Sequence, residues 1–169
     1  MSCKIDKNYR YCHKIWQLLM EFAEFSDEIF IDIYDFDKDK KEIMTLCVEQ
    51  VPAICILNKS QEDRGICFHG IRKGYEFHSF LGSILVVSKN YIDLLENLIK
   101  KVTDISTSLK IQTFVRLTFP YCSFVVRLIY KMVFLNPHIQ ADMIDVAEFP
   151  NLAKKMDPRR AKDANKWYI

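Results

Sequence analysis

The spacing of hydrophobic positions changes several times in the first hundred residues, and each change predicts a new element. Residues 9–25 carry apolar side chains every three or four positions, which predicts an amphipathic helix. Residues 29–35 alternate apolar and polar positions, which predicts a strand. The elements predicted after these two are a helix over 37–47, strands over 53–57 and 66–69, and helices over 75–87 and 91–102. Up to residue 87 the order is α-β-α-β-β-α, which predicts an α/β unit.

A second run of elements begins after residue 103. The sequence predicts a strand over 109–117, a helix over 122–135, a strand over 139–146 and a short helix over 149–156. Beyond these the chain is charged and shows no period. We therefore divide it into a first unit over 1–102, a partial second unit over 103–156 and a charged C-terminal tail over 157–169.

The stretch over 51–80 organises the first unit. A Val-Pro dipeptide opens the strand over 53–57, a polar turn follows, and Gly70 and Gly74 precede the next helix. Pro52 fits a cis peptide bond in a tight turn or a trans proline at the start of a strand, and the residues alone leave both alternatives open. Residues 1–8 hold one β-branched residue among mostly polar ones, so this unit is expected to lack its first strand.

Composition narrows the class of protein. Half of the 169 residues are hydrophobic, which is enough for a well-filled core. The net charge of +2 is too small to indicate nucleic-acid binding. Residues 1–8 lack the apolar core of a signal peptide, and no apolar run reaches the roughly 18 residues that a membrane span needs. We therefore expect a soluble, cytoplasmic protein that binds neither nucleic acid nor membranes.

Cysteines carry most of the candidate chemistry. The chain has six of them: Cys3, Cys12, Cys47, Cys55, Cys67 and Cys122. No two have Cys-x-x-Cys spacing and none combines with histidine at zinc-finger spacing, so we expect no metal and no cofactor. In a reducing compartment most are expected to be buried free thiols. Cys55 and Cys67 lie on the two arms of the central hairpin, where they could stay free or form a bridge, and the sequence leaves this open.

An internal repeat relates the two units. The sequence YRYC over 9–12 matches FPYC over 119–122, and each opens an amphipathic helix followed by a strand and a short helix. This pattern, with the stretches VPAICI, GIRKGYEF and AEFPNLAKK, resembles the archaeal protein disulfide oxidoreductases, glutaredoxin-like proteins that fuse two thioredoxin folds. The resemblance covers residues 9–156. It implies an α/β, thioredoxin-like fold, a cis Pro52, and a redox-active Cys-x-x-Cys at the start of each unit's first helix.

The chain departs from that family at the position that performs the chemistry. In the family the first cysteine of each motif lies at a helix N-terminus, where the helix dipole lowers the pKa of its thiol and makes it the attacking group. That position holds Tyr9 in one motif and Phe119 in the other, and only the resolving positions, Cys12 and Cys122, keep their sulfur. A dithiol cycle within either motif therefore lacks its attacking sulfur.

Two functions remain open after this loss. The first is a binding or assembly role without dithiol catalysis, for a protein or peptide partner. Its candidate binding residues are Tyr9, Tyr11, Pro52, Phe119, Pro120 and Tyr121. The second is residual thiol–disulfide oxidoreductase activity through a single cysteine, Cys122 or Cys12. Two alternatives assign no function to these residues. In the first, the two thiols are buried in the core and the aromatic rings only cover helix ends. In the second, the chain is a shortened gene product without a selected function.

The strands of the second unit predict an association. In a thioredoxin-like unit a hairpin extends the sheet on one side of such strands, and here that hairpin is absent. The strands over 109–117 and 139–146 must therefore pack on the first unit, on Trp167 and Tyr168, or on another copy of the chain. We expect self-association as a homodimer.

Overall fold

The computed structural model describes residues 2–4, 10–24, 27, 29–57, 63–70, 75–89, 92–116, 121–155 and 166–168. The strands are β1 (Ser2–Lys4), β2 (Asp32–Tyr34), β3 (Ala53–Leu57), β4 (Asp63–His69), β5 (Leu109–Val115), β6 (Ile139–Asp145) and β7 (Lys166–Tyr168). The helices are α1 (Arg10–Ala23), α2 (Lys40–Thr45), α3 (Tyr75–Lys89), α4 (Glu96–Thr103), α5 (Cys122–Leu135) and α6 (Pro150–Lys155).

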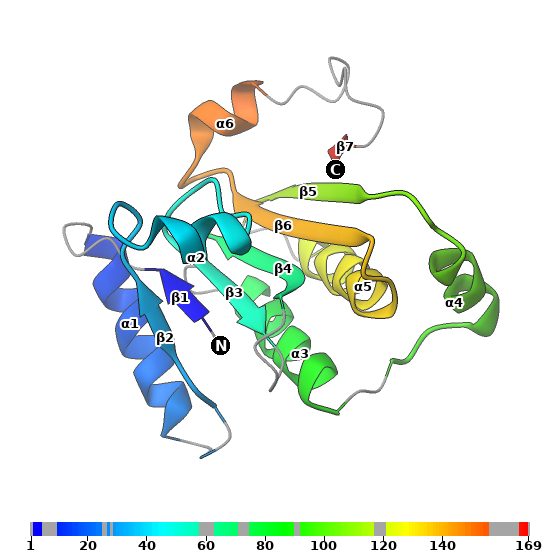
Figure 1. Cartoon of the computed structure of the whole chain (residues 1–169), viewed down its shortest axis with the longest axis horizontal. Coiled ribbons are helices and arrows are strands. Elements are labelled where there is room, and N and C mark those ends of the chain that lie inside the picture. The colour runs from blue at the N-terminus through cyan, green and yellow to red at the C-terminus, as the bar shows by residue number, and fades with distance from the viewer. Residues whose placement is uncertain are drawn as a thin grey trace.

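All of these strands belong to one sheet, in the order β2-β1-β3-β4-β6-β5-β7 (Figure 1). β3 runs antiparallel to β1 and to β4, and the other neighbouring pairs are parallel. The two predicted units meet where β4 pairs with β6, with Cys67 opposite Asp142 in the register. The units therefore share one continuous sheet.

The central hairpin has the predicted position. The Val51–Pro52 peptide bond is cis, which is the alternative that the family resemblance implied. Pro52 is buried, and its carbonyl accepts a hydrogen bond of 3.1 Å from the N–H of Gly70. The register between β3 and β4 shifts after Ile56, and Gly65, with a φ of 66°, supplies the left-handed backbone at this irregularity.

The two faces of the sheet pack against different helices. Side chains alternate along a strand, so neighbouring residues of β3 and β4 point to opposite faces. The larger cluster holds Leu19 of α1 and Phe80 of α3, together with α5 residues and Ile54, Ile56, Ile66 and Phe68 of the hairpin. The smaller cluster, on the other face, combines Leu46 and Val48 after α2 with Ala53, Cys55 and Cys67. In Figure 1, α3 and α5 lie together on one side of the sheet and α2 on the other.

The prediction that the first strand is missing is wrong. Ser2–Lys4 forms β1, which pairs in parallel with β2 and antiparallel with β3. A three-residue strand with little β-propensity of its own is stabilised here because it has a partner strand on each side. Its sequence gives little sign of this, since both partners lie about thirty or more residues further along.

The C-terminal part of the chain contains a strand that the sequence did not predict. Lys166–Tyr168 forms β7 and pairs in parallel with β5, so the segment expected to be a charged tail extends the sheet. β6 packs on the first unit through β4, and β5 lies between β6 and β7. Two of the three expected packing sites for the second unit are therefore occupied within the chain. Self-association stays a prediction.

Candidate functional site

The start of α5 is where the second motif places its remaining cysteine. Cys122 is the first residue of the helix and a free, half-buried thiol. Its side chain packs against the larger hydrophobic cluster. Tyr121 before it has helical backbone angles, and its carbonyl accepts a hydrogen bond of 3.2 Å from the N–H of Phe124, which begins the helix. The Cys122 thiol therefore lies at the edge of the core, partly packed and partly exposed to solvent.

The structure covers the predicted site residues unevenly. Tyr9, Phe119 and Pro120 lie outside the described residues, and so do the side chains of Tyr11 and Cys12 within α1. Tyr121 is 69% exposed, as a binding residue requires. Pro52 is buried, so it offers little surface to a partner as the chain stands. The proposed aromatic surface therefore stays a prediction.

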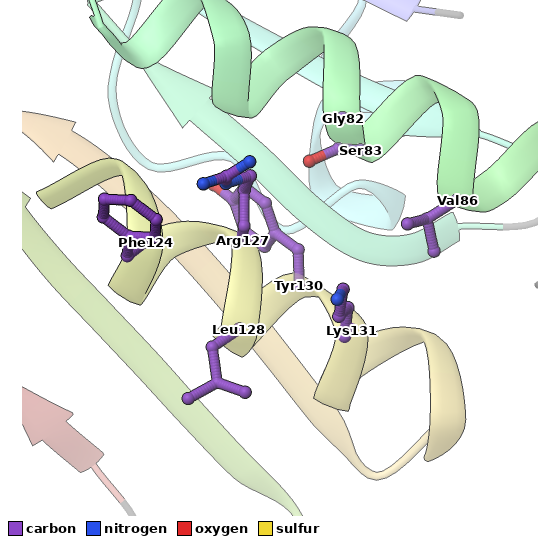
Figure 2. A pocket seen from close by; sticks show the side chains of 8 residues that line it. All are labelled: Gly82, Ser83, Val86, Phe124, Arg127, Leu128, Tyr130 and Lys131. Atoms are coloured by element: carbon purple, nitrogen blue, oxygen red, sulfur yellow. The ribbon is translucent and has the colours of Figure 1, made fainter. Parts of the chain in front are cut away.

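A hollow between α3 and α5 was not predicted from the sequence (Figure 2). Its volume is about 350 Å³. It is lined by Gly82, Ser83 and Val86 of α3 and by Phe124, Arg127, Leu128, Tyr130 and Lys131 of α5. Phe124 and Leu128 are large apolar residues that remain 61% and 44% exposed. The sequence signal was their position on α5, away from the stripe of Val126, Ile129 and Val133 that faces the core.

Two cations stand among these apolar groups. The guanidinium of Arg127 lies 4.9 Å from the centre of the Phe124 ring, a cation–π contact. Its Nε also donates to the carbonyl of Ser123 at 3.4 Å. Lys131 Nζ donates to the carbonyl of Asp93 at 2.9 Å. Both side chains are thus held at the hollow, which combines apolar surface with positive charge.

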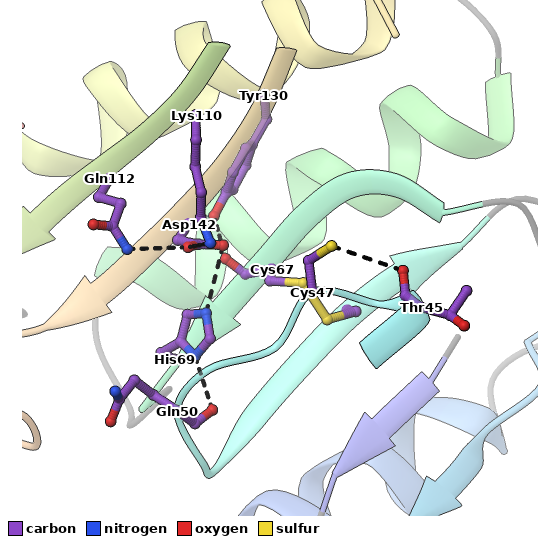
Figure 3. Close-up of a disulfide and its surroundings, with 10 residues drawn as sticks. Thr45, Cys47, Gln50, Cys67, His69, Lys110, Gln112, Tyr130 and Asp142 are labelled. Carbon is purple, nitrogen blue, oxygen red and sulfur yellow. Dashed lines mark hydrogen bonds and ion pairs between the residues drawn. A yellow bond between two sulfur atoms is a disulfide. The ribbon is translucent and has the colours of Figure 1, made fainter. Parts of the chain in front are cut away.

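A buried polar cluster lies on the opposite side of the sheet from α5 (Figure 3). Asp142 of β6 is its centre: Oδ2 is 3.1 Å from Lys110 Nζ and accepts from Gln112 Nε2 at 3.3 Å, and Oδ1 is 3.5 Å from His69 Nε2. The other ring nitrogen of His69 lies 3.0 Å from the carbonyl oxygen of Gln50. Because these residues come from β4, β5 and β6, the cluster links the two units.

The charges of this cluster shift its pKa values. Burial raises the pKa of Asp142, but the hydrogen bond and charge of His69 and the ammonium of Lys110 outweigh it, so the pKa is lowered overall. Burial likewise lowers the pKa of Lys110, whereas the carboxylates of Asp142 and Glu49 raise it above its ordinary value. Both shifts favour the charged pair.

Next to this cluster, Cys55 and Cys67 form a disulfide, which settles the alternative that the sequence left open. They are directly opposite in the hairpin register, with Cα atoms 4.3 Å apart. Among the described side chains the free cysteines are Cys47, which is exposed, and Cys122. Over the same part of the chain, no group of three or more metal-binding side chains gathers, and no helix has the length and apolarity to span a bilayer.

Comparison with known proteins finds relatives of this chain by sequence. No family model matches the chain. Curated relatives are the alkyl hydroperoxide reductase component AhpF of Staphylococcus aureus, 30% identical over 145 residues, and that of Staphylococcus epidermidis, 32% identical over 137 residues. These alignments cover 78% and 81% of this chain but 29% and 24% of the relatives. The chain therefore spans less than a third of the length of the relatives it matches.

Solved structures agree. A structure of AhpF from Enterococcus faecalis superposes with a TM-score of 0.86 at 25% identity, over 97% of this chain and 77% of that one. The NTD_N/C domain of the same protein superposes with a TM-score of 0.85 at 27% identity, over 91% of this chain and 74% of that one. The structure of a Sulfolobus solfataricus protein superposes with a TM-score of 0.63 at 14% identity, over 98% of this chain and 82% of that one. At this identity the match supports the fold alone.

These matches refine the resemblance seen in the sequence. The expected α/β, thioredoxin-like fold is confirmed. The archaeal structure shares this fold, while the relationship detectable in sequence is to the bacterial reductase component. The chain is thus a thioredoxin-like α/β protein homologous to the N-terminal domain of AhpF.

Proposed function

We propose that the chain is a protein-binding module that has kept the thioredoxin fold and lost the dithiol chemistry at its motifs. The proposed partner is a polypeptide segment with apolar and acidic side chains, bound at the hollow between α3 and α5. The observation that carries this proposal is the exposure of Phe124 and Leu128 beside Arg127 and Lys131 on α5.

The loss of dithiol chemistry follows from the motif. Exchange within one Cys-x-x-Cys needs an attacking sulfur and a resolving sulfur three residues apart. Phe119 stands at the attacking position and has no nucleophile, so Cys122 has nothing to resolve. The packing of Cys122 against the core supports a structural role for its thiol.

The chemistry of the hollow supports the choice of ligand. Removing exposed aromatic and aliphatic side chains from water lowers the free energy, so their burial by a partner favours binding. Arg127 is already positioned over Phe124, so a carboxylate of the partner would meet a cation whose side chain is partly ordered before binding. Aromatic residues and arginine are the residues that most often dominate protein interfaces.

The relatives support a protein as the partner. They are named as one component of a reductase, and the homologous region is a minor part of each. We therefore propose that the ligand belongs to another polypeptide of a comparable hydroperoxide-reducing system. A second copy of this chain is the competing occupant.

An alternative function is thiol–disulfide exchange by a single cysteine. It draws on the position of Cys122 as the first residue of α5, where a thiolate would lie near the N-terminal end of the helix dipole. Cys12 holds the same position in the first motif, where it is the third residue of α1. This alternative requires rapid alkylation of one of these thiols in the native protein, and loss of activity when that cysteine is replaced by serine.

A binding experiment tests the proposed function. The probe is a fluorescein-labelled peptide in which leucines alternate with acidic residues, and anisotropy is recorded for the wild type and for Phe124→Ser. We expect the variant to bind at least about tenfold more weakly, which is the loss typical of an interface anchor. Phe30→Ser is the matched control, because Phe30 is 70% exposed and does not line the hollow.

Two further results would count against the proposal. Equal binding by the wild type and Phe124→Ser would show that the peptide does not use the hollow. Sedimentation of the wild type as a dimer that Phe124→Ser dissociates would identify the occupant as a second copy of the chain. A peptide with lysine in place of its acidic residues is the charge control, and we expect it to bind more weakly than the acidic one.

A further inference from the structure

We infer that Cys47 and the Cys55–Cys67 disulfide form a thiol–disulfide site on the sheet face opposite α5, in which Cys47 carries electrons from a dithiol reductant to the buried bridge. This site uses neither of the motif cysteines, so it goes beyond the proposed function.

The bridge is sealed from solvent. Cys55 and Cys67 are 2% and 4% exposed, and they lie in the smaller hydrophobic cluster with Leu46 and Val48. β4 is held in place at this point, because the hydroxyl of Tyr130 donates to the carbonyl of Cys67 at 3.0 Å. A reductant in solution therefore has little direct access to either sulfur of the bridge.

Cys47 lies in the turn that covers the bridge. Its two neighbours in the chain, Leu46 and Val48, pack in the same cluster as Cys55 and Cys67. Figure 3 draws Cys47 in the surroundings of the disulfide, with its sulfur directed toward the carbonyl of Thr45. The Cys47 side chain itself is exposed, and its sulfur lies 4.0 Å from the carbonyl oxygen of Thr45. The turn that covers the buried disulfide thus carries a thiol open to solvent, and this thiol reaches the bridge when its side chain rotates away from Thr45.

The backbone at Cys47 is unusual for a cysteine. The N–H of Cys47 donates to the carbonyl of Met44 at 3.1 Å and that of Val48 to the carbonyl of Ile43 at 3.3 Å, which is the Schellman motif that ends a helix. Its central position requires a left-handed residue, and Cys47 has a φ of 50°. Glycine or asparagine is the ordinary choice there. The turn itself therefore has no need of a sulfur.

The exchange balances in atoms and electrons. The Cys47 thiolate attacks one sulfur of the bridge, so a bond from Cys47 to that sulfur forms as the Cys55–Cys67 bond breaks, and the released sulfur takes a proton. This first step conserves the number of disulfides. An external dithiol then attacks the exposed Cys47 sulfur, and its second thiol resolves the mixed disulfide. The reductant leaves as a disulfide, having given two electrons, and the chain holds three thiols.

The rate of reduction of the bridge tests this inference. Wild type, Cys47→Ser and Cys122→Ser are exposed to dithiothreitol under native conditions, quenched by alkylation, and mapped by mass spectrometry for Cys55 and Cys67. We expect Cys47→Ser to slow reduction of the bridge at least tenfold and Cys122→Ser to leave it unchanged. Equal rates for the wild type and Cys47→Ser would overturn the inference.

A trapping experiment tests the same geometry without relying on rates. In Cys67→Ser and Cys55→Ser a single sulfur of the bridge remains, and each variant is treated with oxidised glutathione. We expect Cys47 to form a disulfide with the remaining cysteine in at least one of them. Failure in both variants, with a wild-type circular dichroism spectrum, would contradict the inference. If these variants do not fold, the comparison of the wild type with Cys47→Ser still decides.

Discussion

Asp142 on β6 lies opposite Cys67 on β4, and this register joins the two thioredoxin-like units into one sheet. The same carboxylate forms the 3.1 Å ion pair with Lys110 of β5. A charge this well buried is tolerated because the Lys110 ammonium, the Gln112 amide and the His69 ring surround it. The polar cluster therefore stabilises the join between the two units.

Replacing Asp142 by asparagine should destabilise the fold by about 3 kcal/mol at neutral pH, since it leaves the Lys110 ammonium without its buried partner. The folded state holds the pKa of Asp142 below its ordinary 3.8, so the carboxylate stabilises the protein above that pH. The contribution is lost as the pH falls through the lowered folded-state pKa. Urea unfolding at pH 7 and below about pH 4 should therefore show a difference between wild type and variant that shrinks in acid.

The matched control for this experiment is Asp27→Asn, because Asp27 is exposed. It should change the free energy of unfolding by no more than about 0.5 kcal/mol at either pH. A loss in Asp142→Asn that stayed constant from neutral to acid pH would show that the carboxylate charge is not what stabilises the join.

Gly70→Ala should destabilise the protein by about 2–4 kcal/mol. The φ of Gly70 is 78°, and a Cβ there would lie 2.9 Å from the Cβ of Glu148 and 3.2 Å from the ring of Phe149. Both the backbone conformation and the lack of space thus exclude a larger residue after β4. The midpoint of thermal unfolding measures the effect, and a wild-type midpoint would contradict the described contact.

Gly82→Ala is the matched substitution, and it should change the stability in the opposite direction to Gly70→Ala. Gly82 lies inside α3, and an added Cβ would meet the Cδ of Arg127 at 3.5 Å, an ordinary contact. The gain in helix propensity should stabilise the protein by about 0.5–1 kcal/mol. Since Gly82 lines the hollow, the same variant should also bind the acidic peptide more weakly in the anisotropy experiment. Tighter binding would show that the peptide lies elsewhere.

Cys47→Gly should stabilise the protein by about 0.5–1 kcal/mol, because glycine adopts the left-handed conformation of this turn without steric cost. Cys47→Ala keeps a Cβ in the same conformation and should change the stability little. Urea unfolding with the Cys55–Cys67 bridge intact compares the two. A destabilised glycine variant would show that the Cys47 side chain contributes to packing, and would remove the argument that its sulfur is kept for chemistry.

Much of the fold could be predicted from the sequence, because its longer elements carry their own period. The hairpin over 51–70, the helix at 122–135 and the strand at 139–145 are where the hydrophobic pattern predicts them. β1 and β7 were missed because each has three residues and depends on neighbouring strands distant in sequence. No period of 2 or 3.6 residues can be detected over so short a stretch.

The candidate site was less predictable, for a different reason. The hollow combines Val86 of α3 with Phe124 and Leu128 of α5, and only the packing of the two helices brings them together. The Cys55–Cys67 bridge depends on a hairpin register that the irregularity after Ile56 could have shifted. By contrast, the loss of the attacking cysteine is visible in the sequence, because it concerns one position in a short motif.

The most direct test of the lost dithiol chemistry is whether Cys122 supports disulfide reduction. Insulin reduction by dithiothreitol is followed with wild-type protein, with Cys122→Ser and with no protein added. We predict the same rate for the wild type and Cys122→Ser, because Phe119 has replaced the attacking sulfur. A wild-type rate well above that of Cys122→Ser would contradict this and establish single-cysteine exchange at the second motif.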